Sequence, residues 1–300
     1  MRIGIFGGDT AARTLDQIVQ AAADAKADGF GSYWLPQIFG LDAITALAVV
    51  GREVPGIDLG TAVVPTFPRH PSMLAGQAIT TATACGGRFI LGIGLSHQIV
   101  VESMWGMSYD KPARHMREYL AILLPLLRDG NVSFAGETLT AHAPLSVAER
   151  PNVPVLIAAL APRMLALAGG IADGTITWMT GPTTLGDYIV PNINAAAADA
   201  GRAAPRVAAS LPVMITNDPD GARTRAAADF AVYGTLPSYR AMLDREGASG
   251  PADVALVGEE STVGKSIQVL ADAGVTDFVG AEFGNTEEQT RTREFMRTLL

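Results

Sequence analysis

The stretch "RFILGIGLSHQIVVESMWG" (residues 88–106) holds the pattern that decides the fold. A continuous apolar run ends at Gly94 and is followed at once by Ser96, His97 and Gln98. Apolar runs without polar alternation predict strands buried on both faces, as in parallel sheets. Glycines at such a strand end let a backbone or a flat ligand approach closely, whereas the bland alternative is that they relieve crowding in the core.

Strand patterns of this kind alternate with helical patterns along the whole chain. They fall at eight positions, namely 2–6, 31–35, 57–66, 88–94, 153–160, 174–179, 206–216 and 276–283. Each is followed by a segment of helical periodicity, and eight such units predict a closed (β/α)8 TIM barrel. A doubly wound open sheet is the alternative, but the turn after the first strand lacks the G-x-G-x-x-G fingerprint expected there.

Two interruptions of the alternation predict insertions, at 131–152 and 233–258. Within the first, "NVSFAGETLT" (131–140) has two short alternating runs around Gly136 and predicts a surface hairpin.

Helix ends are marked by glycines, with Gly29 after the first helix and a glycine pair after the third.

The composition indicates a globular protein with a sizeable core. The 300 residues are 48% hydrophobic and 17% charged, with a net charge of −8, and no Lys/Arg run favours nucleic acid as a partner. The single cysteine, Cys85, excludes an intramolecular disulfide. The N-terminus reads as a strand and not as a signal peptide, and no apolar run reaches about 18 residues, so we expect a cytoplasmic protein without membrane partners.

In a barrel, function gathers just past the C-terminal strand ends. The residues there are mostly small or aromatic, with few acids, which favours a flat and largely apolar ring over a metal. They are Gly7, Gly8, Asp9, Pro36, Gln37, Phe39, Pro65, Thr66, Phe67, Arg69, His70, Gly94, Ser96, His97, Gln98, Ala161, Pro162, Arg163, Trp178, Met179, Thr180, Glu282 and Phe283.

Histidine spacing gives no support for a metal site. We expect His115 on a helix surface and His142 in the hairpin, whereas His70 belongs either to loop structure or to the site wall. His97 is the best functional candidate because it follows a strand end directly. "GIGLSHQ" also lacks the G-x-S-x-G elbow of a serine hydrolase, and "VGKS" (263–266) lacks the first glycine of a P-loop.

The turn "LAPRM" (160–164) offers an anion site at a helix start. Pro162 at the first helical position leaves neighbouring N–H groups free, and the helix dipole together with Arg163 favours a negative charge. The alternative is an ordinary strand-to-helix turn with a solvated arginine.

Three segments resemble the bacterial luciferase-like monooxygenase superfamily. They are "GTAVVPTFPRHPSMLAGQAITTATACGGRFILGIG" (60–94), "VPVLIAALAPRMLALAGGIADGTITW" (153–178) and "GFGSYWLPQ" (29–37). Within the superfamily the chain is most similar to the coenzyme F420-dependent oxidoreductases. The resemblance implies one (β/α)8 barrel domain over residues 1–300, a homodimer, and a cofactor at the C-terminal mouth of the barrel.

The resemblance also implies roles for residues of this mouth. A non-prolyl cis peptide or a bulge is expected near the strand end at Val64, Pro65 and Thr66. These three residues, with Gln37, would back the cofactor ring, and Gly94 and Ser96 would border it. The turn formed by Ala161, Pro162, Arg163 and Met164 would take the phosphate.

Pro36 and Gln37 stand where many F420-dependent members have Asp-His, so His97 or Glu102 would serve as the acid or base in place of that histidine. The implied activity is hydride transfer between C5 of F420 and a small substrate, with Trp34, Phe39, Phe67, Trp105 and Trp178 as pocket or core residues. The alternatives are a monooxygenase using reduced FMN and oxygen, or a cofactor-binding relative without turnover.

Overall fold

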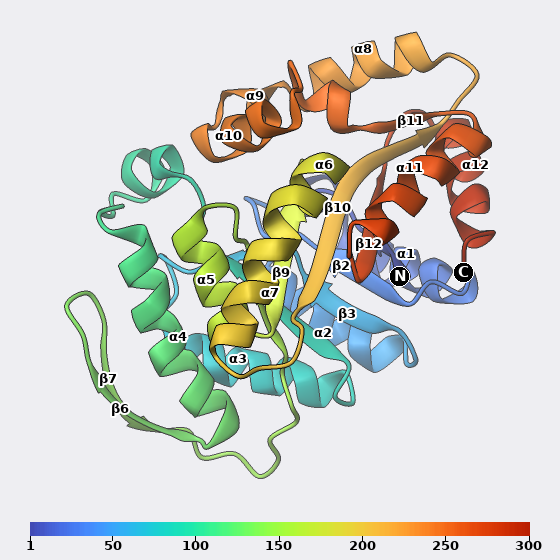
Figure 1. Ribbon diagram of the computed structural model, residues 1–300. Coiled ribbons are helices and arrows are strands. Elements are labelled where there is room, and N and C mark those ends of the chain that lie inside the picture. The colour runs from blue at the N-terminus through green and yellow to red at the C-terminus, as the bar shows by residue number, and fades with distance from the viewer.

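A computed structural model describes residues 1–300, and its parallel strands close into the barrel that the sequence predicts (Figure 1). Strand β10 pairs with β9 on one side and with β12 on the other, which completes the ring that runs from β1 through β2, β3, β5 and β8. The strands of the ring are β1 (Arg2–Phe6), β2 (Ser32–Leu35), β3 (Asp58–Thr61) with its continuation β4 (Val64–Pro65), β5 (Phe89–Gly94), β8 (Val155–Ile157), β9 (Gly174–Trp178), β10 (Arg206–Ile215) and β12 (Asp277–Glu282).

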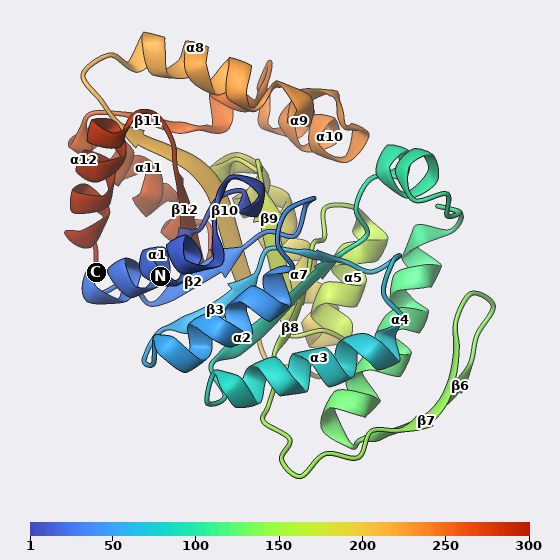
Figure 2. The same ribbon diagram turned by 180° about the vertical axis from the view of Figure 1, so that it is seen from behind.

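Helices surround the barrel on the outside, as the two opposite views show (Figures 1 and 2). The main helices are α1 (Leu15–Ala27), α2 (Ala43–Glu53), α3 (Pro71–Ala84), α4 (Pro112–Arg128), α5 (Pro162–Gly170), α7 (Val190–Asp199), α8 (Pro219–Asp229), α11 (Glu260–Asp272) and α12 (Thr286–Arg297). The expected glycine ends are confirmed, because Gly29 follows α1 at φ 93° and Gly86 and Gly87 follow α3 at φ 62° and 79°. Only glycine adopts this left-handed region without steric cost.

The first insertion contains the predicted hairpin, formed by β6 (Asn131–Ala135) and β7 (Thr140–Pro144). Its turn is fixed to α4 by the buried carboxylate of Glu118. That group accepts hydrogen bonds from the backbone N–H groups of Glu137 (3.0 Å), Thr138 (2.8 Å) and Leu139 (3.0 Å). A two-stranded hairpin is marginal by itself, so this attachment explains its ordered position beside α4.

The second insertion holds small helices and one additional strand. They are α9 (Ala231–Thr235), α10 (Pro237–Glu246) and β11 (Leu256–Gly258), while α6 (Pro182–Thr184) follows β9. Strand β11 extends the sheet beyond the ring by pairing with residues 213–215 of β10. The sequence analysis missed β11 because three residues are too few to give a strand pattern.

The predicted strand 57–66 is interrupted, and this corrects the sequence analysis. The peptide bond between Ala62 and Val63 is cis and separates β3 from β4, as the family resemblance implied for this strand end. The Thr61 side chain bonds to β5 at the interruption. Its hydroxyl donates to the carbonyl oxygen of Gly92 (2.7 Å) and lies 2.8 Å from the Gly92 amide nitrogen.

The barrel interior is filled by one apolar layer from six strands. The layer consists of Trp34, Ile90, Leu156, Ile176, Ala208 and Val279, all at most 4% exposed. Trp34 is the largest of them, and its indole N–H donates to Ser32 Oγ (2.8 Å). Gly60 on the neighbouring strand makes room for its ring, because a Cβ there would overlap Trp34.

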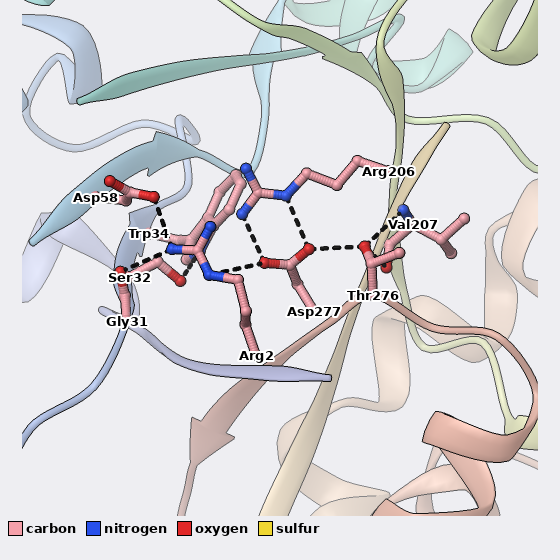
Figure 3. A network of polar contacts seen from close by, with 9 residues as sticks. All are labelled: Arg2, Gly31, Ser32, Trp34, Asp58, Arg206, Val207, Thr276 and Asp277. Carbon is pink, nitrogen blue, oxygen red and sulfur yellow. Dashed lines mark hydrogen bonds and ion pairs between the residues drawn. The ribbon is translucent and has the colours of Figure 1, made fainter. Parts of the chain in front are cut away.

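An ion network closes the N-terminal end of the barrel (Figure 3). Arg206 donates two hydrogen bonds to the buried carboxylate of Asp277, from Nε at 2.8 Å and from Nη2 at 2.6 Å. Thr276 donates to the same carboxylate (2.7 Å), and Arg2 pairs with Asp58 (2.6 Å). These residues begin or precede strands β1, β3, β10 and β12, so the network ties the strand starts together.

We expect Gly60→Ala to destabilise the protein by about 1–3 kcal/mol, because the added methyl group would force the Trp34 ring to move inside a filled barrel. Urea unfolding at pH 7 measures the change. The control is Gly76→Ala in α3, where a Cβ meets only Leu145 Cδ1 at 3.9 Å and should gain about 0.5–1 kcal/mol of helix stability. Equal stability of wild type and Gly60→Ala would contradict this account of the interior.

Candidate active site

The C-terminal mouth of the barrel has an apolar and partly open floor. Ala62, Val63 and Ala158 are half-buried there, whereas the layer beneath them is fully enclosed. Gly94 lies close beside them, because a Cβ at this position would come within 2.6 Å of Val63 Cγ2 and 3.3 Å of Ala158 Cβ. The glycine thus relieves crowding at the strand end, and the small side chains around it leave a surface suited to a flat ring.

Two residues next to this floor have left-handed backbones although they are not glycine. Ser96 follows β5 at φ 60°, and Met179 follows β9 at φ 53°. Such conformations cost free energy for residues with a Cβ and gather at functional sites. Both lie just past barrel strands, which supports this end as the functional one.

The side chain of His97 is half-buried at the mouth. Its ring centroid lies 5.6 Å from that of Tyr239 in α10, and burial lowers its pKa, so the imidazole is neutral at pH 7. Its carbonyl oxygen accepts from the N–H groups of Val100 (2.9 Å) and Val101 (3.0 Å), which start a π-helical turn. Glu102 of this turn is exposed and accepts a hydrogen bond from Gln98 Nε2 (2.9 Å).

His115 is buried, and the expectation of a helix-surface position is wrong. Its Nε2 lies 3.1 Å from Thr66 Oγ1, and its ring stacks on Phe67 with centroids 4.1 Å apart. Burial lowers its pKa to about 4, which the nearby Glu118 only partly opposes. The helical pattern of α4 failed here because Thr66 and Phe67, from the loop between β4 and α3, cover a face that would otherwise meet solvent.

Thr66 links this buried histidine to the mouth. Its backbone N–H donates to the carbonyl oxygen of Gly94 (2.9 Å), beside the floor. The ring of Phe67 lies between His115 and Tyr109, whose centroid is 5.3 Å away, so Phe67 packs within a stack of three rings. His115 therefore supports the strand end from behind.

Several residues expected at the site hold its loops in place. The side-chain oxygen of Gln37 accepts from Ala43 N–H (2.7 Å) at the start of α2. Arg69 forms an ion pair with Asp42, the cap of the same helix, and its carbonyl oxygen accepts from the Tyr119 hydroxyl (2.9 Å). Phe39 is 60% exposed.

The remaining wall positions have similar local roles. His70 caps α3, Asp9 caps a short 3₁₀ turn, and Glu282 pairs with Arg293 of α12 (2.7 Å). The pairing partners of these groups lie in the same loops or in adjacent helices. These contacts hold the loops around the mouth in place.

Val64 and Met164, two residues of the expected cofactor site, have side chains that are buried in the core between strands and helices. The side chain of Val63 lies beside Gly94. Pro65 is buried and pairs with Gly94 through β4.

The start of α5 has free hydrogen-bond donors. The N–H group of Met164 donates to the carbonyl oxygen of Ala161 (2.9 Å), and Pro162 has no N–H group. The N–H groups of Ala161 and Arg163 form no backbone hydrogen bond. The Arg163 side chain is exposed and has no ion-pair partner in the chain. Two amides and one guanidinium at a helix N-terminus can bind an anion such as a phosphate.

The opposite end of the barrel has hollows lined by charged groups, among them Arg150, whose buried Nε has no hydrogen-bond partner. One, of about 270 Å³, is lined by Arg128 and Asp173, which lie 4.0 Å apart, and the other, of about 180 Å³, by Asp58 and Arg206 of the ion network. No group of three or more His, Cys, Asp or Glu side chains is placed to hold a metal. None of the helices combines the length and the apolar character needed to cross a membrane.

The chain is similar to known proteins over nearly its full length. The sequence model of the family described as "Luciferase-like monooxygenase" matches residues 1–283. A Mycobacterium tuberculosis protein, provisionally named a coenzyme F420-dependent oxidoreductase, is 29% identical over 85% of this chain and 76% of its own length. The 5,10-methylenetetrahydromethanopterin reductase of Methanolobus tindarius is 28% identical, covering 81% and 74%.

Solved structures share the fold. The coenzyme F420-dependent tetrahydromethanopterin reductase of Methanopyrus kandleri superposes with a TM-score of 0.82 at 21% identity, covering 99% of this chain and 98% of that one. The oxygenating component of 3,6-diketocamphane monooxygenase from Pseudomonas putida, in complex with FMN, reaches 0.77 at 17% identity, covering 99% and 96%. Both agree with the closed barrel described above.

We expect acid to destabilise the protein through His115. The unfolded imidazole titrates near 6.5 and the folded one near 4, so the unfolded state binds more protons as the pH falls through this window. Stability present well above pH 6.5 should therefore drop by about 2 kcal/mol at pH 5, and the loss from this group levels off only below pH 4. Urea unfolding of wild type and His115→Gln at pH 7 and pH 5 isolates the effect.

The exposed His142, replaced by Gln, is the control and should leave the wild-type pH dependence unchanged. If His115→Gln loses as much stability between the two pH values as wild type, the assigned burial of His115 is wrong.

Proposed function

The chain belongs to the luciferase-like monooxygenase family, and we propose that it uses coenzyme F420 to transfer a hydride to or from a small organic substrate. Similarity to its relatives identifies it as an oxidoreductase. One of these relatives is named for coenzyme F420 and another for a methanopterin substrate. The observation that carries the proposal is the half-open apolar floor next to the free donors of α5. A flat ring and a phosphate-bearing tail would need these two surfaces side by side.

The residues of the mouth fit such a cofactor. Val63, Gly94 and Ala158 would lie under the ring, with Pro65, Thr66 and Ser96 at its border. Arg163 and the N–H group of Ala161 would hold the phosphate, while Pro162 and Met164 shape the turn. When bound, F420 supplies the hydride donor or acceptor at C5 of its deazaflavin ring.

The protein would contribute position, water exclusion and a proton. His97 is neutral at pH 7 because burial lowers its pKa, so it can accept a proton from a substrate hydroxyl. Glu102 remains the second candidate, and its exposure and its bond to Gln98 favour His97 over it. Gln37 would act indirectly, because its side chain fixes the loop before α2 and thereby the shape of the mouth.

Reduced FMN and oxygen form the alternative, because an apolar floor of small side chains would also accept an isoalloxazine ring. A cofactor-binding protein without turnover is the third possibility. We further propose a cytoplasmic homodimer, as the family resemblance implies, and the exposed apolar side chains of Phe39, Met73, Ile99 and Met104 could take part in such contacts.

We expect the purified protein to bind F420 with micromolar or tighter affinity and to bind FMN much more weakly. Titration of each cofactor, followed by its fluorescence, measures both affinities. Tight FMN binding without F420 binding would replace the proposal with the monooxygenase alternative. F420 binding without reoxidation of the reduced cofactor by an alcohol, ketone and enone panel would favour the non-catalytic alternative.

Arg163→Ala should weaken F420 binding by about 1–3 kcal/mol, since it removes a charge-assisted contact to the phosphate. The same fluorescence titration checks this. Arg52→Ala at the far end of α2, which also lacks an ion-pair partner, is the matched control and should bind as wild type does. Unchanged affinity in Arg163→Ala would remove the start of α5 from the cofactor site.

A further inference from the structure

Five rings form a continuous row over the mouth, from β1 to the loop after β5. We call Phe6, Trp178, Tyr233, Tyr239 and His97 the aromatic row. Successive centroids are 5.3 Å (Phe6–Trp178), 5.7 Å (Trp178–Tyr233), 5.3 Å (Tyr233–Tyr239) and 5.6 Å (Tyr239–His97) apart. Tyr233 and Tyr239 come from α9 and α10, which lie over the end of the barrel where β9 and β10 finish (Figure 1).

The row is held in place from its far side. Glu246, at the end of α10, accepts hydrogen bonds from the N–H groups of Thr183 (3.0 Å) and Thr184 (2.7 Å) in α6. Met242 and Leu243 of α10 are buried, and Thr184 donates to the Met242 carbonyl oxygen (3.3 Å). The second half of α10 is therefore anchored, and Tyr239 in its first half is positioned against His97.

Packing alone does not explain the polar atoms of the row. The indole nitrogen of Trp178 is buried and has no hydrogen-bond partner. The Tyr233 hydroxyl lies near this N–H, and the nearby indole acts to lower the pKa of Tyr233. The two groups nevertheless form no hydrogen bond. Buried donors in proteins are nearly always satisfied, so the unpaired indole N–H of Trp178 indicates that an acceptor is supplied from outside the chain.

The electrostatic surroundings favour an uncharged occupant. Burial raises the pKa of the Tyr233 and Tyr239 hydroxyls and lowers that of His97, so all three are neutral at pH 7. The charge that acts on Tyr233 is negative and comes from the Asp9 carboxylate. An anionic substrate would lose its hydration here without gaining a cation.

We propose that the aromatic row is the substrate wall of the site and takes a neutral, flat, unsaturated compound. Its carbonyl-type oxygen accepts hydrogen bonds from Trp178 Nε1 and from the Tyr233 hydroxyl, while the rings of the row contact its faces. The inference deepens the proposed function and rests on it for the identity of the wall as a substrate site. Trp178 and Tyr233 are thereby specificity-determining residues.

Benzamide and benzoate test the proposal, because they have nearly the same shape and differ in charge. Saturation-transfer difference NMR measures their binding to the protein without cofactor and again with F420 added. We expect benzamide to bind in both states, and benzoate to bind at least tenfold more weakly. Trp178→Phe and Tyr233→Phe, which keep a ring but remove one donor each, should weaken benzamide binding about three- to tenfold.

Tyr188→Phe is the control, since Tyr188 packs against Arg245 outside the row and should leave benzamide binding unchanged. F420 affinity should change less than twofold in Tyr233→Phe, which separates a substrate wall from a cofactor contact. Equal binding of benzoate and benzamide, or unchanged benzamide binding in both row variants, overturns the proposal. Failure of wild type to bind F420 would instead overturn the proposed function, and the measurements without cofactor would still decide whether the row binds neutral carbonyl compounds.

Discussion

The packing of Trp34 against Gly60 inside the ring of strands is the constraint on which the site depends. A closed barrel must fill its interior with side chains, and here one bulky indole needs a bare backbone opposite it. At the N-terminal end, the ion network ties the strand starts together and uses their charged side chains. Open surface is left at the C-terminal end, where Ala62, Val63 and Ala158 are too small to close the barrel.

The two sides of the mouth differ in charge and in the groups that they offer to a ligand. At the start of α5, free N–H groups and Arg163 provide positive potential for an anion. Across the mouth, the aromatic row offers only neutral donors and ring faces, next to the carboxylate of Asp9. A single molecule with a charged tail and a flat head, and a second uncharged molecule beside it, match this division.

The ring of strands could be predicted from sequence because apolar runs alternate with helical segments, of which the first and third end at glycines. The interruption at Ala62 and Val63 was implied only by the family resemblance, because both residues fit a strand pattern and the break shows in the pairing with β5. Burial of His115 also escaped prediction, because Thr66 and Phe67, which cover it, are distant in sequence and reach α4 only after folding. Tyr233 and Tyr239 were missed for a related reason: an insertion outside the repeating pattern carries no periodic signal.

The position of these two tyrosines has an evolutionary consequence. They belong to a segment, residues 231–246, that follows α8 and is fastened to α6 by the Glu246 carboxylate. The strands that build the floor need no contribution from it. Changes confined to that segment would therefore let descendants of one scaffold acquire new chemical preferences while the small side chains of the barrel floor stay unchanged.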